Sequence, residues 1–312
     1  MTASTGPGPL LLSEMPVAMI ATLFRARVCR IIGPLLLAVA LAGCSAIRLG
    51  YNQAPELAYW YLDSYVDFTE PQTGQVRTDL AALQAWHRQT ELPAYVALLE
   101  RAQRLMPSNV TPEQLCELYA DARPRVQALT ERAEPTLSAV TLTLKPEQLA
   151  HLARQLDKRS EKWLDEWLDG TPGERQTRYF KKLLDRAEMV YGRLDSGQRA
   201  ALRASVAASS FDADLSYRES QRRHVDTLQT LRLIQSGGLG AERTRDEARG
   251  LLERALQSPD PMYRKHQDRL IQENCRTYAA LHNSTSPGQR AKGMEALKGY
   301  EADLRALMPQ RR

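Results

Sequence analysis

An apolar repeat of three and four residues, running through most of the chain after Cys44, is the feature that most constrains the fold. The repeat is carried by Leu57, Trp60, Tyr61, Tyr65 and Phe68, by Leu149, Leu152, Leu156, Trp163 and Trp167, by Phe180, Leu183, Ala187, Val190 and Leu194, and by Val225, Leu228 and Leu231. Such spacing places apolar side chains on one face of an α-helix. The best alternating run, residues 140–143, is too short to indicate a strand. The sequence therefore predicts an all-α fold, an elongated bundle of antiparallel helices with short connections marked by proline and glycine.

Several predicted helix starts share one capping pattern, in which a residue with a hydroxyl side chain is followed by proline. The hydroxyl caps free amides of the first turn, and proline is tolerated there because its missing N–H would have no partner. We expect such starts at Thr111, Thr171, Ser258 and Ser286, with looser versions at Leu144 and Leu194. We expect breaks between helices at Pro71, Pro93, Pro107, Pro124, Pro135, Gly170 and the turn around Gly237.

The N-terminus has the organisation of an export signal. Three arginines, at positions 25, 27 and 30, precede a twelve-residue apolar run, which suits a signal peptide and is short for a membrane span. Leu41-Ala42-Gly43-Cys44 follows and resembles the lipobox of bacterial lipoproteins. That resemblance implies acylation of Cys44, cleavage before it and, because Ser45 follows, sorting to the outer membrane, facing the periplasm. An uncleaved apolar anchor is the alternative.

These features divide the chain into a signal peptide, a tethered segment, one helical domain and a short tail. Residues before about position 19 are superfluous to the signal, so Met19 is a plausible start. The predicted boundaries are 1–43 for the signal peptide, 44–55 for the lipid-anchored segment, 56–308 for a single helical domain with a hinge near 237–240, and 309–312 for a frayed tail.

Two cysteines, Cys116 and Cys275, remain in the mature chain after Cys29 and Cys44 are assigned to the signal and the anchor. In an oxidising compartment they can form a disulfide that closes a long loop. The alternative is two separately buried thiols, because free cysteine packs as a small apolar residue.

Charge and motifs exclude several function classes. Three of the 42 basic residues and one of the 37 acidic residues precede Cys44, which leaves 39 and 36 interspersed along the helices. This is typical of a solvated surface and does not indicate nucleic-acid binding. The five histidines are scattered and no phosphate-binding loop or nucleophile elbow is present, so no metal, nucleotide or other cofactor is predicted. His87 and Glu91 have metal-compatible spacing, which is common by chance.

Two dense segments invite a functional interpretation. Residues 59–68 hold five aromatic side chains; they fit a membrane-interface helix, but two acids and no basic residue favour docking into the bundle core. Residues 158–170 bring Asp165 and Asp169 onto one helix face, an arrangement that acid–base chemistry can use. The alternative is an ordinary charged surface, because Lys158, Lys162 and Glu166 of the same stretch supply i, i+4 pairs.

Several stretches together resemble a proteobacterial lipoprotein family of the domain-of-unknown-function kind. They are residues 50–53, 61–68, 87–95, 163–170 and 282–290. The resemblance covers nearly the whole mature chain and transfers no catalytic residue. A second resemblance is to periplasmic helical chaperones of the Spy and CpxP type, whose Leu-Thr-x-x-Gln signature is approached by residues 142–148 and 194–198.

The sequence thus favours a lipid-anchored, periplasm-facing helical protein that acts by binding, as a scaffold or a chaperone-like envelope protein. Its expected partners are the membrane, through the lipid at Cys44, and an envelope protein. The alternatives are an envelope hydrolase that uses carboxylates such as Asp165 or Asp63, and a purely structural spacer. An apolar concavity on the folded body would support binding.

Overall fold

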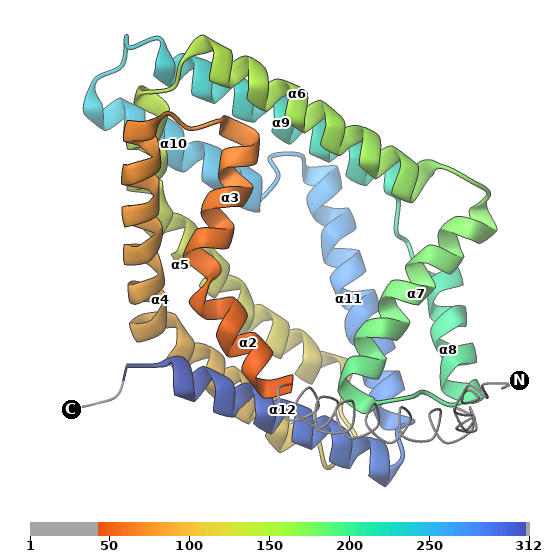
Figure 1. Cartoon of the computed structure of the whole chain (residues 1–312). Helices are drawn as coiled ribbons and strands as arrows, with labels where there is room; N and C mark the ends of the chain where they lie inside the picture. Colours follow the sequence, from red (N-terminus) through yellow and green to blue (C-terminus); the bar gives the residue numbers. More distant parts are fainter. Residues whose placement is uncertain (1–42, 310–312) are drawn as a thin grey trace, which may run out of the picture. The chain divides into compact units, whose positions relative to one another are not determined.

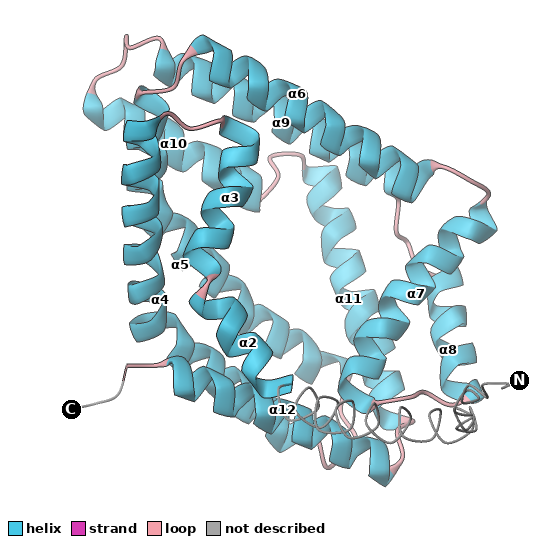
Figure 2. Ribbon diagram, in the orientation of Figure 1, coloured by secondary structure: helices cyan, strands magenta, loops and turns pink. Residues whose placement is uncertain are grey.

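The computed structural model describes residues 43–309, which form helices and turns without any strand (Figures 1 and 2). The helices are α2 (Gly43–Asn52), α3 (Ala54–Val66), α4 (Glu70–Leu105), α5 (Pro112–Leu142), α6 (Pro146–Trp163), the π-helical turn η1 (Leu164–Leu168), α7 (Pro172–Tyr191), α8 (Ser196–Ala207), α9 (Ala213–Gln235), α10 (Ala241–Leu256), α11 (Pro261–Asn283) and α12 (Pro287–Leu307). The chain divides into two compact units, Met1–Ile47 and Arg48–Arg312, and the second contains α3 to α12. The all-α prediction is confirmed.

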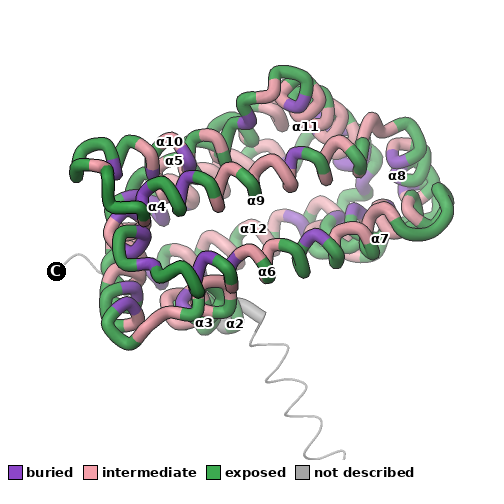
Figure 3. Tube along the Cα trace, turned by 90° about the horizontal axis from the view of Figure 1, so that it is seen from above, coloured by how far each residue is buried: buried purple, intermediate pink, exposed green. Residues whose placement is uncertain are grey.

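The helices of the second unit pack against one another in a closed order of neighbours. The order is α3, α4, α12, α7, α8, α11, α5, α10, α9, α6 and back to α3. Helices far apart in sequence therefore lie side by side, as α6 and α9 do in Figure 1. Buried and exposed residues alternate along each helix (Figure 3), as expected when every helix turns one apolar face inward.

Two clusters of buried apolar side chains hold the helices together. The first joins α3, α4, α5, α6, α9 and α10, and the second joins α7, α8 and α11. The first consists of Tyr59, Val76, Val140, Leu144, Leu149, Leu152, Leu231 and Leu251; the second of Phe180, Leu183, Ala187, Leu194, Leu202, Val206 and Leu281.

Most of the expected helix starts are present. Thr111, Thr171 and Ser286 each accept a hydrogen bond from the third helical amide, and proline follows each of them. The expectation for Ser258 is wrong: α11 begins two residues later than expected, with Asp260 as its cap. Ser258 is instead fully buried, where its hydroxyl donates to Glu219 at 2.9 Å.

Three expected breaks are wrong, because Pro93 lies inside α4 and Pro124 and Pro135 lie inside α5. A proline inside a helix removes one backbone hydrogen bond and costs about 3 kcal/mol. Burial of Leu92 and Val96 on either side of Pro93 offsets that cost, so the helix continues through it. The breaks at Pro107, Gly170 and Gly237 are present, and both glycines have positive φ.

A pair of glutamines clasps the starts of α4 and α6 together. Gln72 Nε2 donates to Thr143 O at 3.0 Å, and Gln148 Nε2 donates to Asp67 O at 2.8 Å. The two amide groups also bond each other, with Gln148 Nε2 2.8 Å from Gln72 Oε1. Each side-chain oxygen additionally accepts the amide of its own helix cap. The clasp fixes the end of α3 and the end of α5 against these two starts.

The starts of α8 and α12 carry a second clasp of the same design. Gln198 Nε2 donates to Ser284 O at 3.0 Å, and Gln289 Nε2 donates to Arg193 O at 3.1 Å. The two side-chain amides again bond each other, with Gln198 Nε2 2.8 Å from Gln289 Oε1. An apolar or small residue, a cap and a glutamine three residues later thus form a local motif that also joins distant helices.

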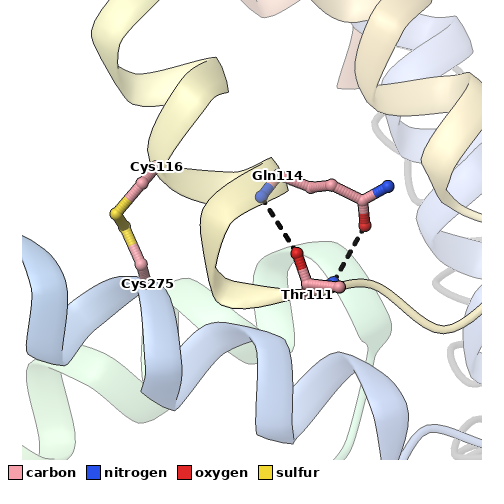
Figure 4. Close-up of a disulfide and its surroundings, with 4 residues drawn as sticks. All are labelled: Thr111, Gln114, Cys116 and Cys275. Carbon is pink, nitrogen blue, oxygen red and sulfur yellow. Dashed lines mark hydrogen bonds between the residues drawn. A yellow bond between two sulfur atoms is a disulfide. The ribbon is translucent and has the colours of Figure 1, made fainter.

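Cys116 of α5 and Cys275 of α11, the two cysteines that the sequence offers as a pair, are bonded in the structure (Figure 4). Their Cα atoms are 5.5 Å apart and 159 residues separate them. Figure 4 also shows the cap at Thr111, close to the bond. The disulfide therefore joins the start of α5 to the middle of α11.

Candidate functional site

A largely apolar cavity of about 460 Å³ lies between α3, α4 and α5. We call it the apolar chamber. Leu231 of α9 and Leu252 of α10 also line it, and the rest of its wall consists of Leu62, Val66, Phe68, Val76, Asp79, Leu80, Ala82, Leu83, Arg132, Ala133, Pro135, Thr136, Leu137, Val140, Thr141 and Leu144. Pockets of a few hundred cubic ångströms with apolar walls are typical of small-molecule sites.

The turn between α3 and α4 positions two walls of the chamber. Asp67 adopts a left-handed conformation with φ 58°, which ends α3 and reverses the chain. Asp63 Oδ1 accepts the amide of Phe68 at 2.8 Å, and the glutamine clasp holds the carbonyl of Asp67. The reversal lets Val66 of α3 face the same space as Val76 of α4.

The inner wall is firmly packed. Val76 is 2% exposed, and Val140 and Leu231 are buried beside it in the first core cluster. The hydroxyl of Thr141 already has a partner within α5, because it donates to the carbonyl of Leu137 at 2.7 Å. The inner wall therefore presents few hydrogen-bonding groups, and a polar guest would lose its hydrogen bonds to water without replacing them.

Charged groups occur at the rim of the chamber. Asp79 is half-buried and Arg132 is exposed, and among the described residues neither forms an ion pair. An arginine can pair with a carboxylate or phosphate through two parallel hydrogen bonds. The rim can thus interact with a charged head group of a guest whose apolar part occupies the interior.

A second, more polar cavity of about 760 Å³ lies between α5 and α10. Leu252 lines both cavities, so they are neighbours. The buried carboxylate of Glu134 lies in the wall and accepts the hydroxyl of Ser138 at 2.8 Å. Arg123 and Arg249 line the same cavity.

The carboxylates that sequence reasoning singled out for catalysis do not form one site. Asp63 caps the turn after α3, whereas Asp165 is exposed on η1 and Asp169 is exposed just after it. None of the three lines the apolar chamber. Trp163 and Trp167 pack against each other with ring centroids 5.6 Å apart. Trp167 also packs against Phe211, with ring centroids 5.3 Å apart. This segment forms an aromatic cluster.

His87 and Glu91, the pair with metal-compatible spacing, belong to a polar cluster between helices. His87 Nδ1 lies 2.8 Å from the Tyr51 hydroxyl, and its ring stacks on Tyr95. Burial lowers the pKa of His87, which favours the neutral ring. Glu91 is 1% exposed and faces Arg125 at 3.6 Å. Within residues 43–309, no three His, Cys, Asp or Glu side chains gather as a metal site.

Sequence reasoning missed the α4 wall of the chamber. Val76, Leu80 and Leu83 follow the i, i+4, i+7 spacing of a helix face, and this local signal could have identified them. The position assigned to lipid attachment, Cys44, lies at the start of α2, but its side chain is outside the described residues. Of the predicted signal peptide, residues 1–43, all but the last residue lie outside the described part of the chain. None of the helices in residues 43–309 is both long and apolar enough to cross a bilayer.

Comparison with protein families matches residues 64–264 to DUF6279, a family of unknown function, which covers more than half of the chain. The chain belongs to DUF6279. The matched range contains every residue that lines the apolar chamber except Leu62, so the chamber is a feature of the DUF6279 part of the chain. No curated protein and no solved structure matches the chain. The further resemblances, to lipoproteins and to Spy and CpxP chaperones, stay predictions.

Proposed function

We propose that this DUF6279 protein is a lipid-anchored protein of the bacterial cell envelope that faces the periplasm and binds a long acyl chain in the apolar chamber. The chamber is the observation that carries the proposal. Its interior offers apolar surface and few hydrogen-bonding groups, which excludes a sugar or a nucleotide as a comparably good guest. Arg132 at the rim favours an acyl chain with an anionic head group.

A binding role agrees better with the site than hydrolysis does. A glycosidase needs two carboxylates within about 5 to 9.5 Å of each other across the scissile bond. The carboxylates of Asp63 and Asp165 lie on different helices, and Asp63 is engaged by the amide of Phe68. The other alternative is a purely structural spacer, and a spacer does not need an apolar chamber of this size.

The first test concerns the anchor. Cells fed a labelled fatty acid should incorporate the label into the wild-type protein, and fractionation should place that protein with the outer membrane. Cys44→Ala should abolish both the label and the cleavage after Gly43, because only the thiolate of Cys44 can be alkylated there. Cys29→Ala is the matched control and should be labelled like the wild type. Unlabelled wild-type protein in the cytoplasm would contradict the proposal.

The second test concerns the chamber. We compare Ala82→Trp, which places an indole in the chamber wall, with Ala81→Trp, which places the same group on the neighbouring residue of α4 that does not line the chamber. The acylated protein is held in lipid nanodiscs, and binding of a polarity-sensitive fluorescent fatty acid is measured against empty nanodiscs. Ala82→Trp should weaken binding by about tenfold, equivalent to about 1.4 kcal/mol. Ala81→Trp should bind like the wild type.

Two outcomes of that comparison would contradict an acyl-chain site in the chamber. One is equal binding by both variants, since the chamber would then not be the site. The other is fluorescence from the wild-type protein that does not exceed that of empty nanodiscs. Arg132→Gln should weaken binding of the fatty acid more than binding of the corresponding fatty alcohol, which has no charge for Arg132 to contact.

A further inference from the structure

Helix α3 presents an apolar face that no described residue covers. Leu57, Trp60 and Tyr61 follow i, i+3, i+4 spacing and are 61%, 64% and 54% exposed. The expectation that residues 59–68 dock into the core is therefore wrong for Trp60 and Tyr61. Tyr59 is the buried aromatic residue of this segment, and Tyr65 and Phe68 pack against the core from its edge. A contiguous exposed apolar face on a soluble domain marks an interaction surface.

The polar ends of the two exposed aromatic side chains are already fixed by hydrogen bonds. Trp60 Nε1 donates to Glu56 Oε1 at 2.5 Å, and the Tyr61 hydroxyl accepts from Arg159 Nη1 at 2.7 Å. Tryptophan and tyrosine with apolar bodies and satisfied polar ends are the side chains that membrane interfaces enrich.

The acidic residues of α3 do not leave this face strongly negative. Glu56 is paired with Arg77 of α4 at 2.7 Å. Asp63 accepts the amide of Phe68. The two acids of residues 59–68 are Asp63 and Asp67. Arg77 of α4 and Arg159 of α6, which contact Glu56 and Tyr61 of α3, add positive charge beside α3 that the isolated stretch lacks.

Helix α6 supplies positive charge beside this face. Lys158, Arg159 and Lys162 are exposed, and Lys162 neighbours both of the others on the surface of α6, because it is spaced i, i+4 from Lys158 and i, i+3 from Arg159. Arg159 donates to Tyr61 on α3, and the charge of Lys162 acts on Tyr65.

We propose that this surface docks on a bilayer that carries anionic head groups. We call it the α3–α6 face and define it by Leu57, Trp60 and Tyr61 together with Lys158, Arg159 and Lys162. The three apolar side chains enter the head-group region, and the three cations contact lipid phosphates. Exposed tryptophan, tyrosine and leucine side chains beside exposed cations are the combination that peripheral membrane faces use, and this combination favours an anionic bilayer as the partner.

The chain length to the anchor is compatible with this docking. Thirteen residues separate Cys44 from Leu57, a stretch that spans at most about 45 Å when fully extended. A lipid at Cys44 would therefore keep the α3–α6 face close to the membrane. The tether rests on the proposed anchor, whereas the α3–α6 face does not depend on acyl-chain binding in the chamber.

Depth-dependent fluorescence quenching tests the proposal. The full acylated protein is reconstituted in vesicles of phosphatidylcholine and phosphatidylglycerol, part of which carries bromine on the acyl chains. Bromine quenches tryptophan only at short range, so tethering alone does not quench the folded body. Wild-type fluorescence should be quenched, and Trp60→Phe should lose most of the quenching. Trp86→Phe is the control, because Trp86 is half-buried and packs against His87, and its quenching should equal that of the wild type.

A second variant tests the contribution of the α6 lysines to docking. Lys158→Gln with Lys162→Gln should reduce quenching, as should about 1 M salt, which shortens the screening length to about 3 Å. Equal quenching of Trp60→Phe and wild type would overturn the proposal, and so would equal quenching in vesicles without phosphatidylglycerol. Trp60→Phe should still bind the fluorescent fatty acid, so failure of this proposal and failure of the acyl-chain site are distinguishable.

Discussion

Replacing both Cys116 and Cys275 with serine should lower the free energy of unfolding by about 4 to 5 kcal/mol and the melting temperature by about 10 °C. The bond joins α5 to α11 across 159 residues, a span that contains α6 to α10. Without it, the unfolded chain gains the conformational freedom that closure of so long a loop removes. The folded state should change little, because serine is close to cysteine in size.

Urea unfolding followed by circular dichroism measures this effect. Reduced wild-type protein should match the double serine variant, because both lack the cross-link and differ only in two side-chain atoms. The single variant Cys116→Ser, under reducing conditions, is the control for the substitution itself. Identical midpoints for oxidised wild type and the double variant would contradict the predicted role of the bond.

The second large effect should come from Glu219, which lies at the centre of an ion-pair network between α9 and the start of α11. Its side chain is 3% exposed and accepts from Arg222, Arg223 and Ser258. Arg222 also bonds Asp226, which pairs with Arg254 of α10 at 2.8 Å. Glu219→Gln leaves the arginines without their shared anion, and we expect a loss of about 3 kcal/mol. Glu242→Gln, on the exposed side of α10, should cost almost nothing.

The same network predicts how stability depends on pH. Burial acts to raise the pKa of Glu219, but hydrogen bonds from Arg222, Ser258 and Arg223 outweigh it, so the pKa lies below its ordinary value of 4.5. A carboxyl whose pKa is lower in the folded state stabilises the fold above the unfolded pKa, and this contribution is lost as the pH falls. Wild-type stability should therefore decline below about pH 4.5, and Glu219→Gln should decline less steeply. Equal slopes for the two proteins would contradict this account.

Local signals predicted most of the helix starts but not all of the helix ends. A cap and a glutamine three residues later, as at Thr111 and Gln114, act within one turn and can be read from the sequence. The continuation of α4 through Pro93 depends on the burial of Leu92 and Val96 against other helices, which no local pattern reports. Likewise, the glutamines that cap α4 and α6 could be predicted, whereas their mutual contact could not.

The candidate site was less predictable than the fold. The chamber is assembled from α3, α4 and α5 with one residue each from α9 and α10, so its existence depends on the arrangement of five helices. The spacing of Val76, Leu80 and Leu83 predicts an apolar face but does not distinguish a packed core from a cavity wall. For the same reason the repeat through Leu57, Trp60 and Tyr61 predicted burial, and the structure exposes those residues.

Mapping a photoreactive fatty acid tests the central claim, acyl-chain binding in the apolar chamber, most directly. The acylated protein in nanodiscs is irradiated with the probe, and the modified peptides are identified by mass spectrometry. Adducts should form on chamber residues of α4 and α5, such as Leu80, Leu83 and Leu137, and they should be lost in Ala82→Trp. Adducts confined to exposed helix surfaces, with an unmodified chamber, would contradict the claim.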